Sequence, residues 1–392
     1  MPTLDPLARQ HWTLPIPIHY GPGARDALPG LCRQHGMARP LLVTDRGSRS
    51  LPFVAELLGA MTAAGLAPPL FAGLEPNPTG RAIAPGAAAF RAAGADGVVA
   101  LGGGSGLDGG KGIVLLARQE RHPLFDFVYG AALPAGIGAA DLPPLITIPT
   151  TAGTGAETES TAMVTDTTAI TKRCVWHPLA RPVAAILDPA LTVGLPPKLT
   201  AWTGCDALVH AIEAYLVPQF QPLCDGAALQ ALALLWPSLE RAVDRGDDLA
   251  ARGRMLVGSC LAGVSFLKGL GLVHAISHNV GAAYDTHHGL TNAVLLPPVL
   301  RFNRPAIEGR VGPINQALGL PDERFDTLYA AICGLLDRLE IPKGLAALGA
   351  RPEDARLLAE RSHRDGSTPT NPRPASVAEI EALVAQSMTA AR

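Results

Sequence analysis

The stretch Gly97–Lys111, GVVALGGGSGLDGGK, joins a short apolar run to a glycine-rich loop and to the start of a helical segment. Residues 97–101 are typical of a buried strand, and Leu107–Ala117 is typical of a helix. Successive glycines let the backbone approach a ligand closely, and free N–H groups at a helix N-terminus favour an anion. A pyrophosphate would fit such a loop, although a tight strand-to-helix turn is the simpler alternative. The loop matches neither the GxGxxG nor the P-loop fingerprint.

The same alternation of strand and helix continues on both sides of this stretch. Further buried strands are expected at Pro40–Asp45, Leu145–Pro149 and Ala184–Asp188, and helices at Leu51–Ala64 and Ala82–Gly94. Strands that alternate with helices predict a parallel sheet with helices packed on its faces. The first half of the chain is therefore predicted to be an α/β domain.

The second half of the chain has a different pattern. It carries Ala- and Leu-rich helical periodicity with few β-branched runs, which predicts helices at Pro197–Val217, Ala227–Ala242, Leu249–Phe266, Val273–Ala283, Phe325–Leu339 and Val377–Met388. We expect an N-terminal α/β dinucleotide-binding domain over residues 1–188. An all-α domain is expected over residues 189–392.

Composition limits the class of protein. The chain has 392 residues and is 48% hydrophobic, so it can form a large core and is not globally disordered. With 32 basic and 34 acidic residues the net charge is −2, which argues against nucleic acid or an anionic membrane as a partner. No CxxC pair, signal peptide or spanning segment is found, and six scattered cysteines favour a cytoplasmic location.

A second polar loop, Thr150–Glu157, also follows a predicted strand. Its hydroxyl groups and glycines could line the same ligand site as the glycine-rich loop, because ligands of open α/β sheets bind beyond the carboxyl ends of the strands. An ordinary polar loop is the simpler alternative for this segment.

Histidines cluster in the second half. Asp206 and His210 are four residues apart, as are His274 and His278, so each pair shares a helix face. One carboxylate and several imidazoles form a ligand set suited to Zn²⁺ or Fe²⁺. A histidine on an apolar helix is more often an ordinary core residue, but the repeated pairs favour a metal site.

These features together resemble the iron-containing (group III) alcohol dehydrogenases. Motifs appear in the order of that family almost from end to end, and the ordered set is more specific than any one of them: YGPG at 20–23, LVTD at 42–45, PNPT at 76–79, the GGGS loop with Asp108 and Lys111, IPTTAGT at 148–154, LDP at 187–189, LPP at 195–197, the segments 204–215 and 271–278, and HGLTNA at 288–293.

The resemblance implies roles for individual residues. The metal ligands would be Asp206, His210, His274 and His288. His278 would be a catalytic residue near the substrate, and His287 only a neighbour. The cofactor would be bound by Gly102, Gly103, Gly104, Ser105, Asp108, Thr147, Thr150, Thr151, Thr154 and Lys172.

Two stretches depart from the family pattern. Gly109 and Gly110 replace bulkier residues, which we expect to weaken the start of the helix that follows the glycine-rich loop. The segment Arg173–His177 is also atypical, and it adjoins Lys172, one of the residues that the resemblance assigns to the cofactor.

Asp45 bears on the choice of dinucleotide. It ends a predicted strand, where the ribose of a bound adenosine should lie, and the family uses an Asp at the matching position. A carboxylate can accept hydrogen bonds from ribose hydroxyls and repels a 2′-phosphate, so we expect NAD rather than NADP. Arg46 could soften this preference by neutralising a 2′-phosphate. Alternatively, Asp45 only caps the following turn.

The resemblance implies a metal-dependent alcohol dehydrogenase or aldehyde reductase with a fold like that of dehydroquinate synthase and a site between its domains. It would transfer hydride reversibly between a small primary alcohol and NAD(H), using Fe²⁺, with Zn²⁺ as the alternative metal. Alternatives on the same fold are a maleylacetate reductase, a hydroxy-acid dehydrogenase, and a dehydroquinate synthase-type lyase. An inactive binding protein is a further alternative.

The resemblance also suggests a homodimer or a larger assembly. The segment His11–His19 alternates apolar residues, which suits an edge strand that pairs either between subunits or within one chain.

Overall fold

The computed structural model describes residues 16–389 and divides into two compact units. The α/β unit comprises described residues up to Thr151 together with Ala156–Leu195, and the helical unit comprises Pro196 onward together with the short segment Ala152–Gly155. The main boundary between the units follows Leu195, whereas the sequence expectation placed it after residue 188.

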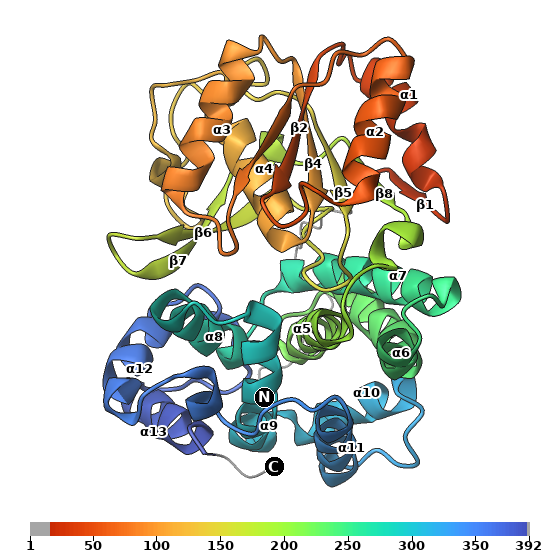
Figure 1. Cartoon of the computed structure of the whole chain (residues 1–392). Coiled ribbons are helices and arrows are strands. Elements are labelled where there is room, and N and C mark those ends of the chain that lie inside the picture. Colours follow the sequence, from red (N-terminus) through yellow and green to blue (C-terminus); the bar gives the residue numbers. More distant parts are fainter. Residues whose placement is uncertain (1–15, 390–392) are drawn as a thin grey trace. The chain divides into compact units, whose positions relative to one another are not determined.

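A six-stranded sheet forms the centre of the α/β unit (Figure 1). Every neighbouring pair in it is parallel. In spatial order the strands are β1 (Ile18–Tyr20), β8 (Ala184–Leu187), β5 (Leu145–Pro149), β4 (Gly97–Gly102), β2 (Pro40–Asp45) and β3 (Leu70–Leu74). A separate antiparallel hairpin consists of β6 (Thr161–Asp166) and β7 (Thr171–Trp176).

Successive side chains of a strand point to opposite faces, so each central strand contributes to two cores. On β4, Val98 and Ala100 pack in one core, while Val99 and Leu101 pack in the other. The helices that cover the two faces are, on the Val99 side, α1 (Leu28–Gln34) and α2 (Pro52–Ala63), and on the Val98 side, α3 (Gly80–Ala92) and α4 (Gly104–Ala117).

The glycines of α4 allow this helix to approach the sheet closely. A Cβ at Gly109 would lie 2.3 Å from Leu74 Cδ1, and one at Gly110 would lie 2.5 Å from the Cβ of Ala100. The helix is continuous from Gly104 to Ala117. Close packing on β3 and β4 accounts for glycine at both positions, and the expectation that these glycines weaken the start of the helix stays a prediction.

The helical unit is built around one buried helix, α5, whose residues are almost all buried from Thr200 onward. The helices of this unit are α5 (Pro197–Leu216), α6 (Pro222–Asp244), α7 (Leu249–Ser265), α8 (Leu272–Tyr284), α9 (His288–Ile307), α10 (Val311–Ala317), α11 (Phe325–Arg338), α12 (Ala355–His363) and α13 (Val377–Ser387). Short 3-10 segments lie at Ala24–Ala27, Leu124–Phe127, Pro178–Ala180, Pro189–Thr192, Phe266–Lys268, Glu308–Arg310, Leu345–Leu348, Pro352–Asp354 and Thr368–Thr370.

The predicted fold class, an α/β unit followed by an all-α unit, is confirmed. Within residues 16–389, no single helix is both long and apolar enough to cross a membrane. One helix pair, Leu249–Lys268 with Leu272–Tyr284, meets that test only jointly and is bent by 104°. The predicted edge strand His11–His19 lies largely outside the described residues. Its continuation, β1, pairs with β8 of the same chain at the edge of the sheet.

Candidate active site

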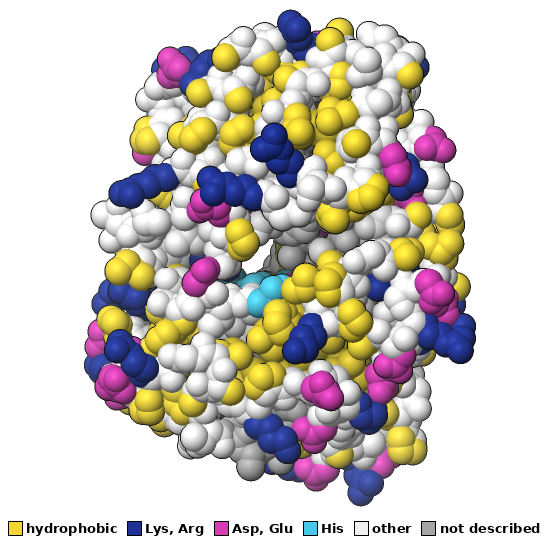
Figure 2. All heavy atoms as spheres, in the orientation of Figure 1, with side chains coloured by type: hydrophobic (Ala, Val, Ile, Leu, Met, Phe, Trp, Pro, Cys, Tyr) yellow, Lys and Arg dark blue, Asp and Glu magenta, His cyan; other side chains and the backbone are white. Residues whose placement is uncertain are grey.

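Four side chains from three helices meet inside the helical unit. Asp206 and His210 are one turn apart on α5, His274 lies in the first turn of α8, and His288 begins α9. Each offers one ligand atom, and these atoms all lie within 4.8 Å of one another. The first three residues are buried, whereas the side chain of His288 is 22% exposed. Histidine atoms reach the surface of this unit in Figure 2.

Hydrogen bonds hold two of the imidazole rings. The Nδ1 atom of His274 lies 2.7 Å from Glu213 Oε2, and the Nδ1 atom of His288 lies 3.2 Å from Ser277 Oγ. With Nδ1 protonated and engaged in this way, the Nε2 atom of each ring carries a lone pair. This arrangement, a ring held through one nitrogen while the other is free to act as a ligand, is usual for metal-binding histidines.

Glu213 also fixes the start of α8. Its Oε1 accepts the backbone N–H of Val273 at 2.8 Å, so one carboxylate caps this helix and orients His274. Burial raises the pKa of Glu213 to about 7, although the hydrogen bonds from backbone N–H groups lower it. Burial also lowers the pKa of His274 well below its ordinary value, which keeps its imidazole neutral and able to act as a ligand.

His210 indicates that the group suits a cation. Its Nδ1 atom is buried without a hydrogen-bond partner and lies 4.0 Å from Asp206 Oδ2, and its ring stacks on that of His274 with centroids 4.5 Å apart. Packing several unprotonated imidazoles around one buried carboxylate is costly unless something positive satisfies their lone pairs. One carboxylate and three imidazoles fit a divalent transition metal.

His278 lies beside the four residues without belonging to their group. Its ring is nearly parallel to that of His288, with centroids 5.4 Å apart, and its Nδ1 atom lies 3.0 Å from Asp365 Oδ2. Burial raises the pKa of Asp365, but His278 and the hydrogen bonds from Ser367 outweigh it and lower this pKa overall. Asp365 therefore orients the ring of His278, as Glu213 does for His274.

The glycine-rich loop lies in the α/β unit at the carboxyl end of β4. Gly102 has a φ of 145°, which disfavours any side chain, and Gly103 begins α4 without a capping side chain. The next loop lies alongside, since Thr150 N donates to Gly102 O at 2.9 Å and a Cβ on Gly103 would lie 3.3 Å from Thr151. The uncapped helix N-terminus is suited to an anion.

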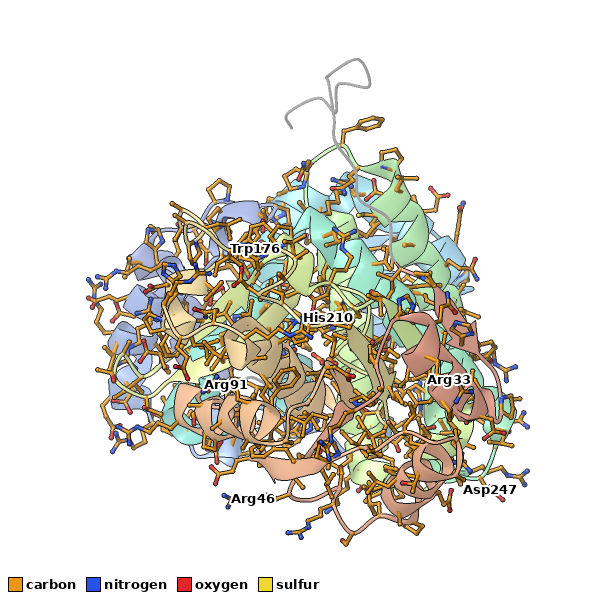
Figure 3. All side chains as sticks on the ribbon, turned by 90° about the horizontal axis from the view of Figure 1, so that it is seen from above. Arg33, Arg46, Arg91, Trp176, His210 and Asp247 are labelled. Carbon is orange, nitrogen blue, oxygen red and sulfur yellow. The ribbon has the colours of Figure 1, made fainter. Side chains whose placement is uncertain are left out.

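Asp45 ends β2 next to this loop. Its carboxylate accepts hydrogen bonds from the backbone N–H of Ser48 at 2.9 Å and from the Ser48 hydroxyl at 2.8 Å. It also faces Gly102, where a Cβ would lie 3.1 Å from Asp45 Oδ2. Arg46 pairs with Glu75 at 3.0 Å and extends toward solvent (Figure 3). Asp45 thus caps a turn and still borders the loop.

Asp108 belongs to a cluster of charges at α4 in which Lys111 and Glu159 are buried and the side chain of Asp108 is 14% exposed. It lies 3.7 Å from Lys111 Nζ and accepts the backbone N–H of Met163 at 3.1 Å, while Lys111 also contacts Glu159 at 2.5 Å. Burial raises the pKa of Asp108 to about 6, opposed chiefly by Lys111 and in part by Lys172 on β7. Lys172 is therefore near enough to Asp108 for its charge to lower the pKa of that carboxyl.

Two of the predicted threonines are placed differently from the rest. Thr147 is fully buried, and its hydroxyl donates to Glu157 O at 2.7 Å, so this group supports the fold and is not available to a ligand. Thr154 belongs to the segment Ala152–Gly155 of the helical unit, whereas Thr150 and Thr151 belong to the α/β unit. Ser105 lies in the first turn of α4.

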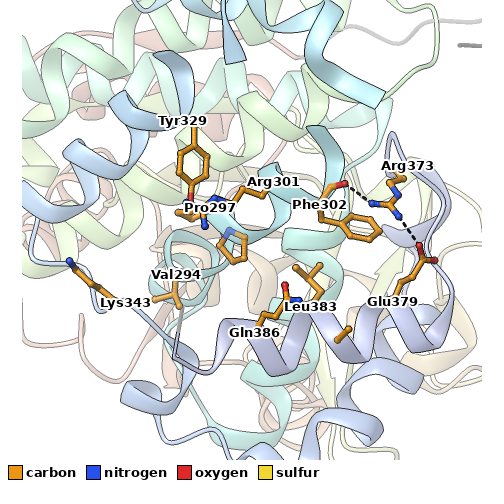
Figure 4. A pocket seen from close by; sticks show the side chains of 12 residues that line it. Val294, Pro297, Arg301, Phe302, Tyr329, Lys343, Arg373, Glu379, Leu383 and Gln386 are labelled. Carbon is orange, nitrogen blue, oxygen red and sulfur yellow. Dashed lines mark hydrogen bonds and ion pairs between the residues drawn. The ribbon is translucent and has the colours of Figure 1, made fainter. Parts of the chain in front are cut away.

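A separate cavity of about 550 Å³ opens on the helical unit (Figure 4). Residues from α9, α11 and α13 line it, including Arg301 and Tyr329, whose guanidinium and ring are 4.4 Å apart. Arg373 at its rim bonds to Phe302 O and to Glu379. None of the four clustered ligand residues lines this cavity.

Comparison with known proteins identifies the family. A sequence model described as iron-containing alcohol dehydrogenase matches residues 15–189, and one for the C-terminal part of the Fe-containing alcohol dehydrogenase family matches residues 200–388. The chain belongs to the iron-containing alcohol dehydrogenase family.

Individual relatives agree with this assignment. The 4-hydroxybutyrate dehydrogenase of Cupriavidus necator is 38% identical over 95% of this chain and 98% of its own length. The crystal structure of a 1,3-propanediol oxidoreductase is 36% identical, covers 97% of this chain and 100% of its own, and has a TM-score of 0.91. Sulfoacetaldehyde reductase from Bifidobacterium kashiwanohense, solved with NAD⁺, is 27% identical over 98% of this chain and 100% of its own, with a TM-score of 0.88.

This dehydrogenase is therefore an NAD-dependent oxidoreductase of alcohols and aldehydes, in a family that uses a divalent metal. The predicted family, enzyme class and cofactors are confirmed. The relatives named are dehydrogenases and reductases, which agrees with the hydride-transfer prediction and not with the lyase alternative.

Sequence reasoning missed the residues that orient the metal group. Glu213 could have been found, because it lies seven residues after Asp206 and three after His210 on the same helix face. Asp365 had no such signal, since 87 residues separate it from His278. His287, which sequence reasoning set aside, caps α9 through its side chain and is not part of the metal group.

Proposed function

We propose that this dehydrogenase reversibly oxidises short primary alcohols to aldehydes with NAD⁺, at an Fe²⁺ centre formed by Asp206, His210, His274 and His288. The observation that supports it most directly is the convergence of these four buried or half-buried groups within 4.8 Å in the helical unit of a chain from this family. Zn²⁺ suits the same ligands and is the alternative metal.

The metal and the protein have different tasks in this proposal. A divalent cation held by these four side chains supplies Lewis-acid stabilisation of the negative charge that develops on the alcohol oxygen. Glu213 and Ser277 hold the imidazole rings of His274 and His288 so that each presents Nε2. His278, fixed through Nδ1 by Asp365, exchanges the alcohol proton at its Nε2 atom.

The α/β unit binds the dinucleotide in this proposal. The N–H groups at the start of α4, with Gly102, Gly103, Gly104 and Ser105, hold the pyrophosphate. Asp45 accepts hydrogen bonds from the adenosine ribose hydroxyls, and Thr150, Thr151, Asp108 and Lys172 line the same end of the sheet. The protein thereby orients the nicotinamide, and hydride transfer itself is chemistry of the cofactor.

The test is a spectrophotometric assay of purified protein loaded with Fe²⁺ or Zn²⁺. A panel of short alcohols with NAD⁺, and of aldehydes with NADH, should show net change in NADH absorbance. Metal removal by a chelator should abolish turnover, and restored metal should recover it. If metal-loaded protein gives no change in NADH absorbance with any substrate of the panel, the proposed reaction is contradicted. If turnover persists after complete removal of the metal, the proposed metal centre is contradicted.

The relatives suggest where to begin the panel. The 4-hydroxybutyrate and 1,3-propanediol enzymes both act on short chains that carry a primary hydroxyl and a second oxygen function, according to their names. We therefore place 1,3-propanediol, 4-hydroxybutyrate and their aldehydes first, with simple alcohols such as butanol as comparison substrates.

We also propose a cytoplasmic homodimer or larger assembly. None of the six cysteines, all of which lie within the described residues, forms a disulfide, as is usual in a reducing compartment. β1 forms an edge of the sheet and exposes Ile18 and Tyr20, which suits pairing with a second copy. Light scattering of the purified protein tests the assembly, and a monomeric mass at micromolar concentration would contradict it.

A further inference from the structure

Asn292 contacts three of the four proposed metal ligands. It lies one turn after His288 on α9 and is fully buried. Its Nδ2 atom is 2.7 Å from Asp206 Oδ1, 3.1 Å from His274 Nε2 and 3.1 Å from His288 Nε2. Its Oδ1 atom is buried without a hydrogen-bond partner.

The surrounding atoms determine which end of the amide faces the centre. Asp206 is an acceptor, and so are the Nε2 atoms of His274 and His288 when their Nδ1 atoms donate to Glu213 and Ser277. Because the proposed metal would use these two Nε2 lone pairs, the carboxylate of Asp206 is the acceptor that the amide keeps when metal is bound. An amide oxygen turned toward these three groups would meet only lone pairs. The NH₂ group has two hydrogens, and its shortest contact is the charge-assisted one to the carboxylate.

We propose that Asn292 is a positioning residue of the metal centre, which fixes Asp206 by donating an N–H bond to its carboxylate. This inference rests on the proposed function, because it presumes that Asp206 is a metal ligand. The unpartnered Oδ1 atom supports it: the amide leaves one polar atom unsatisfied in order to direct its nitrogen at the ligands. Groups that orient metal ligands typically contribute 10–100-fold in metal affinity.

Two variants test the role. Asn292→Ala removes the amide, and Asn292→Thr removes it while nearly keeping the side-chain volume, so agreement between them excludes a cavity effect. Zn²⁺ affinity is measured by competition with a chromophoric chelator, and the coordination of Asp206 is followed by the visible spectrum of the Co²⁺-loaded protein. We expect both variants to bind Zn²⁺ about 10–100-fold more weakly and to show an altered Co²⁺ spectrum.

Asn315→Ala is the matched control. Asn315 is a fully buried asparagine on α10 whose Oδ1 atom, like that of Asn292, has no hydrogen-bond partner, and its Nδ2 atom donates to Asp322 O at 2.8 Å and to Arg324 O at 3.0 Å, none of which belongs to the metal group. We expect this variant to lose thermal stability while it keeps the Zn²⁺ affinity and Co²⁺ spectrum of the wild type. A merely structural role of Asn292 would make its variants behave in the same way.

The outcomes separate this inference from the proposed function. Unchanged Zn²⁺ affinity and Co²⁺ spectrum in both Asn292 variants overturn the inference alone. Tighter Zn²⁺ binding also overturns it, because the amide would then compete with the metal for the ligands. If the wild-type protein binds neither Zn²⁺ nor Co²⁺ at one ion per chain, the proposed metal centre itself fails.

Discussion

At the scale of single residues, the contacts of Asp45 give a sharp test of dinucleotide choice. Its carboxylate borders the glycine-rich loop, and Arg46 is already paired with Glu75. We expect the wild type to prefer NAD⁺ and Asp45→Gly to lose at least tenfold of that preference, about 1.4 kcal/mol, because the repulsion of a 2′-phosphate disappears. The measurement is kcat/KM with NAD⁺ and with NADP⁺.

The control for this prediction is Ser48→Ala. It removes the hydroxyl that donates to Asp45 but keeps the carboxylate, so the preference for NAD⁺ should persist. A ratio of the two kcat/KM values that is unchanged in Asp45→Gly would show that Asp45 serves only to cap its turn.

The largely buried carboxyl of Asp108 predicts a dependence of stability on pH. Its pKa rises on folding from 3.8 to about 6, so the folded protein holds this proton more tightly than the unfolded chain does. The stability that this group contributes is therefore complete below about pH 4 and lost as the pH rises through 6. The amide of Asp108→Asn does not titrate, so this variant should not lose stability in this pH range through position 108. Lys111 keeps Glu159 as its partner in the variant.

We compare the free energy of unfolding of Asp108→Asn with that of the wild type at pH 4.5 and at pH 7.5. We expect the difference, variant minus wild type, to be about 2 kcal/mol larger at pH 7.5 than at pH 4.5. Urea denaturation of both proteins at the two pH values measures this change. A difference between the two proteins that is the same at both pH values would mean that Asp108 titrates normally.

The spacing of ligand residues could be predicted from sequence, but most of the groups that orient them could not. Asp206 and His210 share a face because the helix period dictates it. Asn292 occupies the same relative position after His288, yet an asparagine four residues after a histidine carries no distinctive signal. Asp365 depends on how the segment after α12 packs on α8, which no local pattern reveals.

At the scale of secondary structure, the contact of α4 with the sheet depends on glycine. A Cβ at Gly109 would lie 2.3 Å from Leu74 Cδ1. We expect Gly109→Ala to lower the free energy of unfolding by about 1–3 kcal/mol, because the buried side chain of Leu74, the helix or β3 must move. Urea denaturation measures the effect.

Gly59→Ala is the matched control for this helix glycine. Gly59 is an exposed position of α2, and a Cβ added there would have no neighbouring atom within 4 Å, so alanine should stabilise the protein by about 0.5–1 kcal/mol. If Gly109→Ala is stabilising to the same extent, close packing of α4 is not the reason for glycine at position 109.

The elements that sequence analysis missed share physical causes. Helix α9 contains Pro297, Pro298 and Pro305, which interrupt the usual helix pattern, and it is held by packing against α5 and α8. β3 is a partly exposed edge strand of only five residues, LFAGL, without alternation. The hairpin of β6 and β7 is polar and charged, TAMVTD and TKRCVW, so it carries little strand signal from hydrophobic residues.

At the scale of the whole molecule, the residues proposed to bind the metal and those proposed to bind the dinucleotide belong to two different compact units. Every proposed metal ligand, with Glu213, Asn292 and Asp365, belongs to the helical unit, and the glycine-rich loop with Asp45 belongs to the α/β unit. Asp206, His210 and His274 are buried, and the side chains of Asp45 and Thr151 that approach the glycine-rich loop belong to the same unit as the loop. Binding of metal and of dinucleotide should therefore be separable by mutation.

Asp206→Ala tests this separation from the metal side, and Gly102→Ala from the dinucleotide side. We expect Asp206→Ala to lose metal by elemental analysis and to lose turnover, since it removes the only carboxylate among the four ligands, yet to bind NADH within about threefold of the wild type by fluorescence titration. Gly102→Ala forces a side chain onto a residue with φ of 145°, so it should weaken NADH binding and keep one metal ion per chain. Loss of NADH binding in Asp206→Ala, with its thermal unfolding otherwise intact, would show that the dinucleotide site depends on the metal group and that the two tasks are coupled.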